Sequence, residues 1–317
     1  MAGDKKIPLV SIVGPTASGK TSLAIEIAKL FDGEIVSADS MQIYKGMDIA
    51  TAKPTVEEQQ GIVHHLIGFL DNDCVFSVAQ YCKLAHEIIL DINKRGKLPI
   101  LVGGTGLYVD SVINNTVFSD SDCDDDLRFQ LKQIADENGI DYLLDILSEF
   151  DPDMAQKLAF EKNQKRIIRA IEVYKTTGVT MSEHNKKSHE VESPYKVVKF
   201  GLTATDRQYL YDRINRRVDV MVENGLVEEA KKYLSDNLSS TSSMAIGHKE
   251  LAPFFNGVHD LDVCLDNLKM QTRRYAKRQL TWFKRDQSII WFDIDTNTQN
   301  ALVTNVSKVI KKVLFDE

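Results

Sequence analysis

The sequence predicts an α/β protein in which a parallel sheet flanked by helices forms the core and an all-helical domain is inserted into it. An apolar, β-branched run at 7–13 leads through a glycine-containing loop into a helical pattern. Short apolar runs recur at 34–38, 98–102 and 196–202, each with the length of a buried strand. Residues 119–197 are instead polar, charged and mostly helical by pattern. We therefore place the core at 1–118 and 198–317, and the helical insertion at 119–197.

The composition is that of a globular protein. Of the 317 residues, 43% are hydrophobic and 27% charged, enough apolar surface to bury a sizeable core. No apolar run approaches the roughly 18 residues of a membrane span, and the N-terminal segment lacks the pattern of a signal peptide. The four cysteines, Cys74, Cys82, Cys123 and Cys264, lack the spacing of a zinc site, which indicates reduced thiols. We expect a cytoplasmic protein that does not enter a membrane.

The most specific motif is GPTASGKT at 14–21, which lies between the first strand and the first helix. This is the context of a phosphate-binding P-loop, so the core is predicted to be P-loop NTPase-like. Its glycines let backbone N–H groups curve around a phosphate, and the helix N-terminus adds positive partial charge. Lys20 supplies a full positive charge, and the Thr21 hydroxyl can ligate Mg²⁺. The predicted phosphate-binding residues are Gly14, Pro15, Thr16, Ala17, Ser18, Gly19, Lys20 and Thr21.

The residues that follow two other strands narrow the chemistry. Many P-loop nucleotide hydrolases hold Mg²⁺ with an aspartate at the end of a second strand, but the strand at 98–102 ends in GGTGLY at 103–108. An acid follows the strand at 34–38 instead, in DSMQIY at 39–44. Because ligands collect beyond the carboxyl ends of parallel strands, we expect the P-loop, Asp39 and Thr105 to converge on one cleft. The sequence alone also allows Asp39 to close a turn and Thr105 to cap a helix.

Charge is segregated along the chain. The net charge of −7 would by itself argue against a nucleic-acid binder, but the run at 119–126 is strongly acidic and the segment 273–285 strongly basic. On a helical projection all basic residues of 273–285 share one side, opposite aromatic and aliphatic residues, with no glutamate between them. Such a face is typical of proteins that bind a phosphate backbone. Pairing with the acidic run is the alternative.

Arg217 occupies the edge of the apolar stripe of a helix predicted at about 209–223. From that edge it can reach inward to a phosphate, although an arginine lying along the helix surface fits the pattern as well. The neighbouring histidines at 64–65 have no third ligand nearby, so we expect them to stack or hydrogen-bond in the core rather than hold a metal.

Together these motifs resemble the bacterial tRNA dimethylallyltransferases, a family of isopentenyl transferases. GPTASGKT, DSMQIY and GGTGLY occur here in the order and spacing of that family, and the resemblance extends over nearly the whole chain. Further matching stretches are HHLI at 64–67, NQKRIIRAIEVY at 163–174, RINRRVDVMVENGLVEE at 213–229, AIG at 245–247, KEL at 249–251 and TRRYAKRQLTWF at 272–283.

The resemblance implies an enzyme that moves a dimethylallyl group from its diphosphate to N6 of the adenosine on the 3′ side of the tRNA anticodon. The P-loop would hold the diphosphate with Mg²⁺ at Thr21, and Arg217 would contact it. Asp39 would accept the N6 proton, and Thr105 would lie between the diphosphate and the flipped-out nucleotide. The residues that this resemblance places at tRNA are Asp39, Ser40, Met41, Gln42, Thr105, Arg128, Lys165, Arg166, Ile167, Ile168, Arg169, Arg274, Arg278 and Arg285.

Other functions remain open at this point. A P-loop small-molecule kinase using ATP would explain the P-loop and Asp39, but not the basic helix. A transferase acting on free adenylate would not need basic surfaces, and a non-catalytic RNA-binding module would not need Lys20, Thr21 and Asp39. The acidic run beside Arg128 is an unusual neighbour for an RNA contact. The expected partners are dimethylallyl diphosphate and the tRNA anticodon stem-loop, bound by a monomer with Mg²⁺ as cofactor and capacity for ATP.

Overall fold

The computed structural model describes residues 6–118, 124–235 and 238–316. The chain divides into two compact units, a core unit of Met1–Ile113 with Pro194–Glu317 and a helical unit of Asn114–Ser193. The observed boundaries differ from the predicted ones at both ends of the insertion. Residues 114–118, predicted in the core, belong to the helical unit, and residues 194–197, predicted in the insertion, belong to the core, where Tyr195 begins a strand.

The core unit is built on one sheet of parallel strands, which confirms the predicted α/β class. Its strand order is β3-β2-β4-β1-β5-β6, and every neighbouring pair is parallel. The inner strands are buried on both faces, which explains why their sequences read as unbroken apolar runs. The strands are β1 Ile7–Val13, β2 Gly33–Ser37, β3 His64–His65, β4 Leu98–Gly103, β5 Tyr195–Thr203 and β6 Ile290–Asp293.

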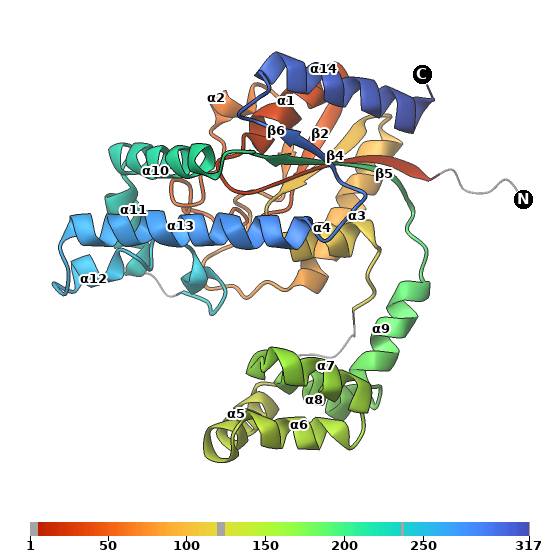
Figure 1. Cartoon of the computed structure of the whole chain (residues 1–317), viewed down its shortest axis with the longest axis vertical. Helices are drawn as coiled ribbons and strands as arrows, with labels where there is room; N and C mark the ends of the chain where they lie inside the picture. Colours follow the sequence, from red (N-terminus) through yellow and green to blue (C-terminus); the bar gives the residue numbers. More distant parts are fainter. Residues whose placement is uncertain (1–5, 119–123, 236–237, 317) are drawn as a thin grey trace, which may run out of the picture. The chain divides into compact units, whose positions relative to one another are not determined.

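Helices cover this sheet (Figure 1). Helices α1 and α14 lie side by side and pack with Ile12, Ile100 and Phe200 into the main apolar core, while α3 packs against β1, β2 and β4. The long helix α13 packs against α10 and α4. The helices of the core unit are α1 Lys20–Leu30, α2 Val56–Gln59, α3 Val78–Lys94, α4 Gly106–Ile113, α10 Arg207–Glu223, α11 Leu226–Leu234, α12 Ala252–Phe255, α13 Leu261–Phe283 and α14 Gln299–Ile310, with short turns at Ser242–Met244 and Lys311–Phe315.

The helical unit has a hydrophobic core of its own, formed by residues such as Leu143, Leu147 and Ile171. Its helices are α5 Asp125–Asn138, α6 Ile140–Ser148, α7 Pro152–Glu161, α8 Gln164–Thr177 and α9 Met181–Glu190. Gly139, with φ of 86°, separates α5 from α6, so the helical pattern at 127–150 is two helices. Most of the acidic run, residues 119–123 with Cys123, lies outside the described residues. Across the described ranges, no helix combines the length and apolar character needed to cross a membrane.

Candidate active site

The P-loop connects β1 to α1 through a backbone that needs glycine. Gly14 has φ of 144°, and a Cβ there would lie 2.5 Å from the carbonyl oxygen of Leu202 in β5. Gly19 precedes α1 in the left-handed conformation, with φ of 88°. The N–H groups of Lys20 and Thr21, in the first turn of α1, have no acceptor within the helix. The loop therefore offers donors and positive partial charge to an anion.

Charged side chains surround this loop. The Nζ of Lys20 donates to the carbonyl oxygen of Pro15 at 2.6 Å. The Lys20 pKa is lowered to about 7, mainly by burial and also by the positive charge of Arg217, while the Asp39 carboxylate acts in the opposite direction. Arg217 is half-buried on α10, where desolvation also lowers its pKa. Two cations held this close to each other leave a site that a polyanion would stabilise.

A second arginine and a buried hydroxyl complete the loop's surroundings. Arg213, one turn before Arg217, donates from Nε to the carbonyl oxygen of Ala17 at 2.8 Å. The Ser18 hydroxyl is buried and has no hydrogen-bond partner among the residues described. A buried hydroxyl group usually has a hydrogen-bond partner, and a phosphate oxygen bound at this cationic loop could be the partner that Ser18 lacks.

Asp39 closes a turn and still presents a free carboxylate oxygen. Its Oδ1 accepts from the N–H groups of Met41 at 2.9 Å and Gln42 at 3.3 Å, as the turn interpretation predicts. In the described part of the chain, no hydrogen bond reaches its Oδ2. Its charge acts on Lys20 and on Tyr275, so it lies among the residues at the strand ends. The turn and a role as a base are therefore compatible.

Thr105 holds the end of β4 against the end of β2. Its backbone N–H donates to Ala38 O at 3.1 Å, and its Oγ1 accepts from the Ser40 N–H at 3.1 Å. A Cβ on Gly103 would lie 2.1 Å from the same Ala38 oxygen, so only glycine permits this approach. The strand ends that carry Asp39 and Thr105 thus come together, as the sequence predicts.

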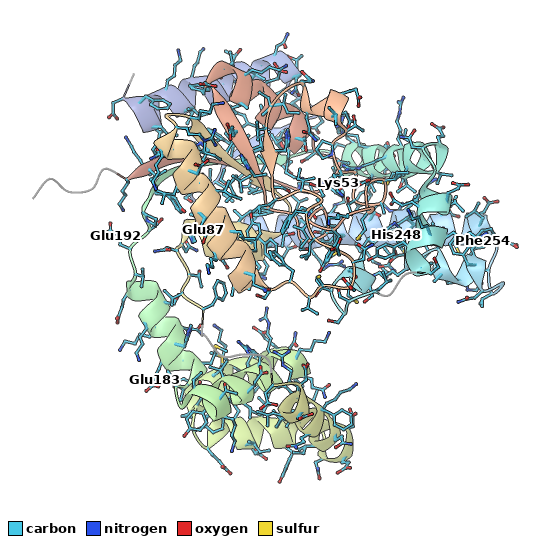
Figure 2. The ribbon with its side chains drawn as sticks, turned by 180° about the vertical axis from the view of Figure 1, so that it is seen from behind. Lys53, Glu87, Glu183, Glu192, His248 and Phe254 are labelled. Carbon is cyan, nitrogen blue, oxygen red and sulfur yellow. The ribbon has the colours of Figure 1, made fainter. Side chains whose placement is uncertain are left out.

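The chain after Asp39 is anchored by half-buried polar side chains. The Gln42 carboxamide donates to the carbonyls of Thr51 at 3.1 Å and Ala52 at 3.3 Å, so a contact of this side chain with tRNA, as predicted, would compete with these bonds. The carboxylate of Glu229, on α11, accepts hydrogen bonds from the backbone N–H groups of residues 48, 49 and 50, at 2.9, 2.7 and 2.9 Å respectively. It also hydrogen-bonds with Nε2 of His248 at 2.8 Å. His248 is buried, and Figure 2 labels it together with Lys53, which follows residues 48–50 in the chain.

The inner side of α13 contributes residues that the sequence reasoning missed. Gln279 is 5% exposed, and its carboxamide bonds to the N–H of Thr16 and the carbonyl of Gly104. The Tyr275 hydroxyl lies close to the side chains of Thr105 and Gln279, and burial raises its pKa, so it stays protonated. The helical projection places Tyr275 in the apolar group. A glutamine in the middle of that apolar side was the signal for a buried polar contact.

The outer side of α13 carries the predicted basic face. Arg274, Lys277 and Arg278 are exposed, and so are Lys284 and Arg285, although the helix ends at Phe283. No carboxylate of the described residues pairs with these five cations. Arg278 lies over the ring of Tyr275 and Arg285 over that of Trp282, at 5.6 and 5.5 Å. Arg273 departs from the prediction, because it bonds to Asn215 Oδ1 at 2.6 Å beside α10.

In the helical unit, the residues predicted to contact RNA divide into two groups. Lys165 and Arg166 are exposed, with Arg166 paired to Glu161. Arg128 and Arg169 both pair with the fully buried Glu172 carboxylate, at 2.8 and 2.6 Å. Removing either arginine would uncover part of a buried charge, which is costly. Ile168 is half-buried, and Ile167 is fully buried in the core of its unit. The Ile167 side chain therefore has no surface to offer RNA, and its predicted place at tRNA stays a prediction.

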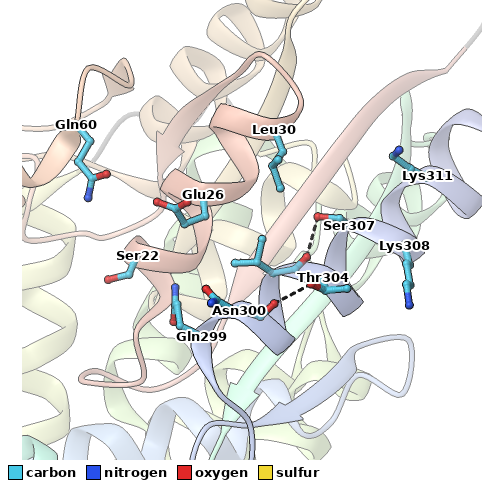
Figure 3. A pocket seen from close by; sticks show the side chains of 11 residues that line it. Ser22, Glu26, Leu30, Gln60, Gln299, Asn300, Thr304, Ser307, Lys308 and Lys311 are labelled. Carbon is cyan, nitrogen blue, oxygen red and sulfur yellow. Dashed lines mark hydrogen bonds between the residues drawn. The ribbon is translucent and has the colours of Figure 1, made fainter.

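The remaining candidate sites contain none of the predicted catalytic residues. A hollow between α1 and α14 is lined by polar side chains such as Glu26, Gln299 and Lys308 together with two apolar ones, and none of the predicted site residues lines it (Figure 3). Within the described residues, no group of three or more His, Cys, Asp or Glu side chains is placed to hold a metal. His65 pairs with Glu34 at 2.8 Å, and His64 contacts the Ile62 carbonyl at 2.9 Å, which agrees with the predicted hydrogen bonding.

Comparison with known proteins identifies the family. Residues 42–286 match the profile described as "IPP transferase". A tRNA dimethylallyltransferase of Thermoanaerobacter sp. (strain X514) is 50% identical over 91% of this chain and 92% of its own length. The solved tRNA isopentenylpyrophosphate transferase of Bacillus halodurans is 44% identical, with a TM-score of 0.72 over 97% of this chain and 98% of that one. A eukaryotic dimethylallyltransferase acting on tRNA is 28% identical, with a TM-score of 0.81 over 98% of this chain and 79% of that one. The chain belongs to the IPP transferase family.

Proposed function

We propose that this chain is a tRNA dimethylallyltransferase that prenylates N6 of the adenosine on the 3′ side of the anticodon. The observation that carries the proposal is the meeting of a cationic P-loop with a carboxylate at the ends of parallel strands. Lys20 and Arg217 lie together at the loop, and the charge of Asp39 acts on both of them. This pairing suits a reaction in which a diphosphate leaves and an amine loses a proton. The relatives named above support the same reaction.

The proposed chemistry is a substitution at C1 of the dimethylallyl group. The N6 lone pair forms the new C–N bond while the C1–O bond breaks, and the electron pair of that bond leaves with the diphosphate. Lys20, Arg217 and the first N–H groups of α1 stabilise the negative charge that develops on the leaving group. The free Oδ2 of Asp39 accepts the N6 proton, which the delocalised amine must lose as it becomes a nucleophile.

The residues at the loop fit a magnesium ion. Mg²⁺ prefers oxygen ligands and usually keeps several waters, binding through one or two protein groups and the substrate phosphates. The Thr21 hydroxyl at the start of α1 provides such an oxygen, and the buried Ser18 hydroxyl lacks a partner among the described residues. When bound, the ion would neutralise charge on the diphosphate oxygens.

Positive surfaces supply the proposed tRNA contacts. The outer side of α13, with Arg274, Arg278 and Arg285, is free of carboxylate partners in the described ranges and is suited to the RNA backbone. Lys165 and Arg166 are exposed in the helical unit and form a second patch. The proposal keeps the expectation of a cytoplasmic, monomeric enzyme whose P-loop has capacity for ATP.

A labelling experiment tests this function against its alternatives. The protein is incubated with unmodified tRNA, AMP and dimethylallyl diphosphate carrying ¹⁴C in the prenyl group, and in parallel with γ-labelled ATP. The proposal predicts that ¹⁴C enters tRNA and is recovered, after digestion, on the adenosine next to the anticodon. Phosphate transferred from ATP would support the kinase instead, and label entering free AMP but not tRNA would support the adenylate transferase.

A further inference from the structure

One buried side chain on α13 joins two of the loops that form the site. Gln279 accepts the Thr16 N–H at 2.8 Å through Oε1 and donates from Nε2 to the Gly104 carbonyl at 3.0 Å. Its partners lie 263 and 175 residues away in the sequence. Both ends of the carboxamide are therefore engaged, one with the P-loop and the other with the loop that leads to Thr105.

The fit around this carboxamide is close. A Cβ on Gly104 would lie 2.0 Å from the Gln279 Nε2, so any larger residue at 104 must displace the amide. Tyr275, one turn earlier on α13, lies with its hydroxyl close to the side chains of Thr105 and Gln279. The two side chains fill the inner side of the helix at the strand ends, while Arg274 and Arg278 occupy its exposed outer side.

We propose that Gln279 is a positioning residue that sets the separation between the P-loop and Thr105, and thereby the separation between the departing diphosphate and the attacking nucleotide. This inference rests on the proposed function. Because Gln279 is buried and its carboxamide is engaged with the two loops, it has no contact to offer tRNA. Reaction rates depend steeply on such distances, and a misplacement of about 1 Å costs about 100-fold. Loss of Gln279 should therefore reduce turnover and leave tRNA affinity in place.

Two variants test this role by different routes. Gln279→Met keeps a side chain of similar length but removes both hydrogen bonds. Gly104→Ala keeps the glutamine residue, but the added Cβ displaces its amide group. For each, the measurements are the single-turnover rate at saturating tRNA and dimethylallyl diphosphate, the KM for tRNA, and the melting temperature. We expect the rate to fall by roughly 10- to 100-fold in both variants, with the KM for tRNA within about twofold of wild type, since the basic side chains remain.

A control variant separates positioning from general destabilisation. Leu268 is buried earlier on α13, in a cluster with Val218 and Leu226. Leu268→Ala should lower the melting temperature while leaving the rate per folded enzyme unchanged. If Gly104→Ala and Gln279→Met kept the wild-type rate per folded enzyme, or raised only the KM for tRNA, the positioning role would be overturned. Absence of prenyl transfer by the wild-type protein would overturn the proposed function itself, and inorganic diphosphate binding measured by calorimetry would still report the effect of each variant on the P-loop.

Discussion

Replacing Lys20 with alanine should weaken dimethylallyl diphosphate binding and turnover together, by an amount that depends on pH. A charge-assisted contact contributes about 1.5–3 kcal/mol, or roughly 10- to 150-fold in Kd, when the ammonium group is protonated. The Lys20 pKa is lowered to about 7 in the free protein, and a bound polyanion raises it again. Binding therefore takes up a proton and is favoured at low pH. Above pH 7 the protonation costs about 1.4 kcal/mol for each pH unit, so the advantage of wild type over Lys20→Ala should shrink.

Calorimetric titration of dimethylallyl diphosphate into each protein, without tRNA and at fixed magnesium concentration, measures this effect from pH 6 to 8.5. Dimethylallyl diphosphate loses its own last proton at about pH 6. This ionisation of the ligand affects both proteins equally and cancels in the ratio of their Kd values. The ratio should be largest at pH 6 and fall by up to about 30-fold by pH 8.5. A ratio near one at pH 6 would remove Lys20 from the diphosphate site, and a large ratio independent of pH would refute the lowered pKa.

Two further predictions concern the RNA surface and the stability of the core unit. Neutralising Arg274, Arg278 and Arg285 together should raise the KM for tRNA. It should also reduce the slope of log KM against log salt concentration by about 0.7–0.9 for each phosphate that the variant no longer neutralises. An unaltered slope would show that this face does not contact RNA. For Glu229, burial raises the pKa, but the hydrogen bonds from His248 and the neighbouring backbone outweigh it, so the folded pKa lies below its ordinary value of 4.5. The charged form therefore contributes stability above about pH 4.5, which is lost as the pH falls further. Glu229→Gln should lower the free energy of unfolding by about 1–2 kcal/mol at pH 7, and urea titrations should show the difference narrowing towards pH 3.5; a constant difference would contradict this.

Local sequence patterns were sufficient for the core of the fold and for much of the site. The apolar run at 7–13 coincides with β1, and the helical pattern that follows it coincides with α1. These elements are predictable because fully buried parallel strands have continuous apolar sequences and because the P-loop has fixed spacing. The meeting of Asp39 and Thr105 follows from parallel topology alone, since strands running the same way end at the same edge.

Contacts between distant segments were not predictable in this way. Arg273 shares the outer arc of α13 in projection, yet it turns towards Asn215 on another helix. Arg128 and Arg169 read as RNA contacts, but the burial of Glu172, which both of them neutralise, depends on how the helices of its unit pack. Gln279 pairs with backbone groups far away in the sequence, and no periodic pattern encodes such partners. Side-chain partners across elements are fixed by tertiary packing rather than by local sequence.

The most direct test of the account is the single-turnover rate of Asp39→Asn, measured beside Asp39→Ala with the melting temperature of each. Asparagine keeps an oxygen for the N–H groups of Met41 and Gln42, so its melting temperature should stay near wild type, whereas alanine should lower it. Neither side chain can accept the N6 proton, so both rates should fall by roughly 10²- to 10⁴-fold. A near-normal rate for Asp39→Asn, together with a destabilised Asp39→Ala, would show that Asp39 only closes the turn, and would contradict its assignment as the base.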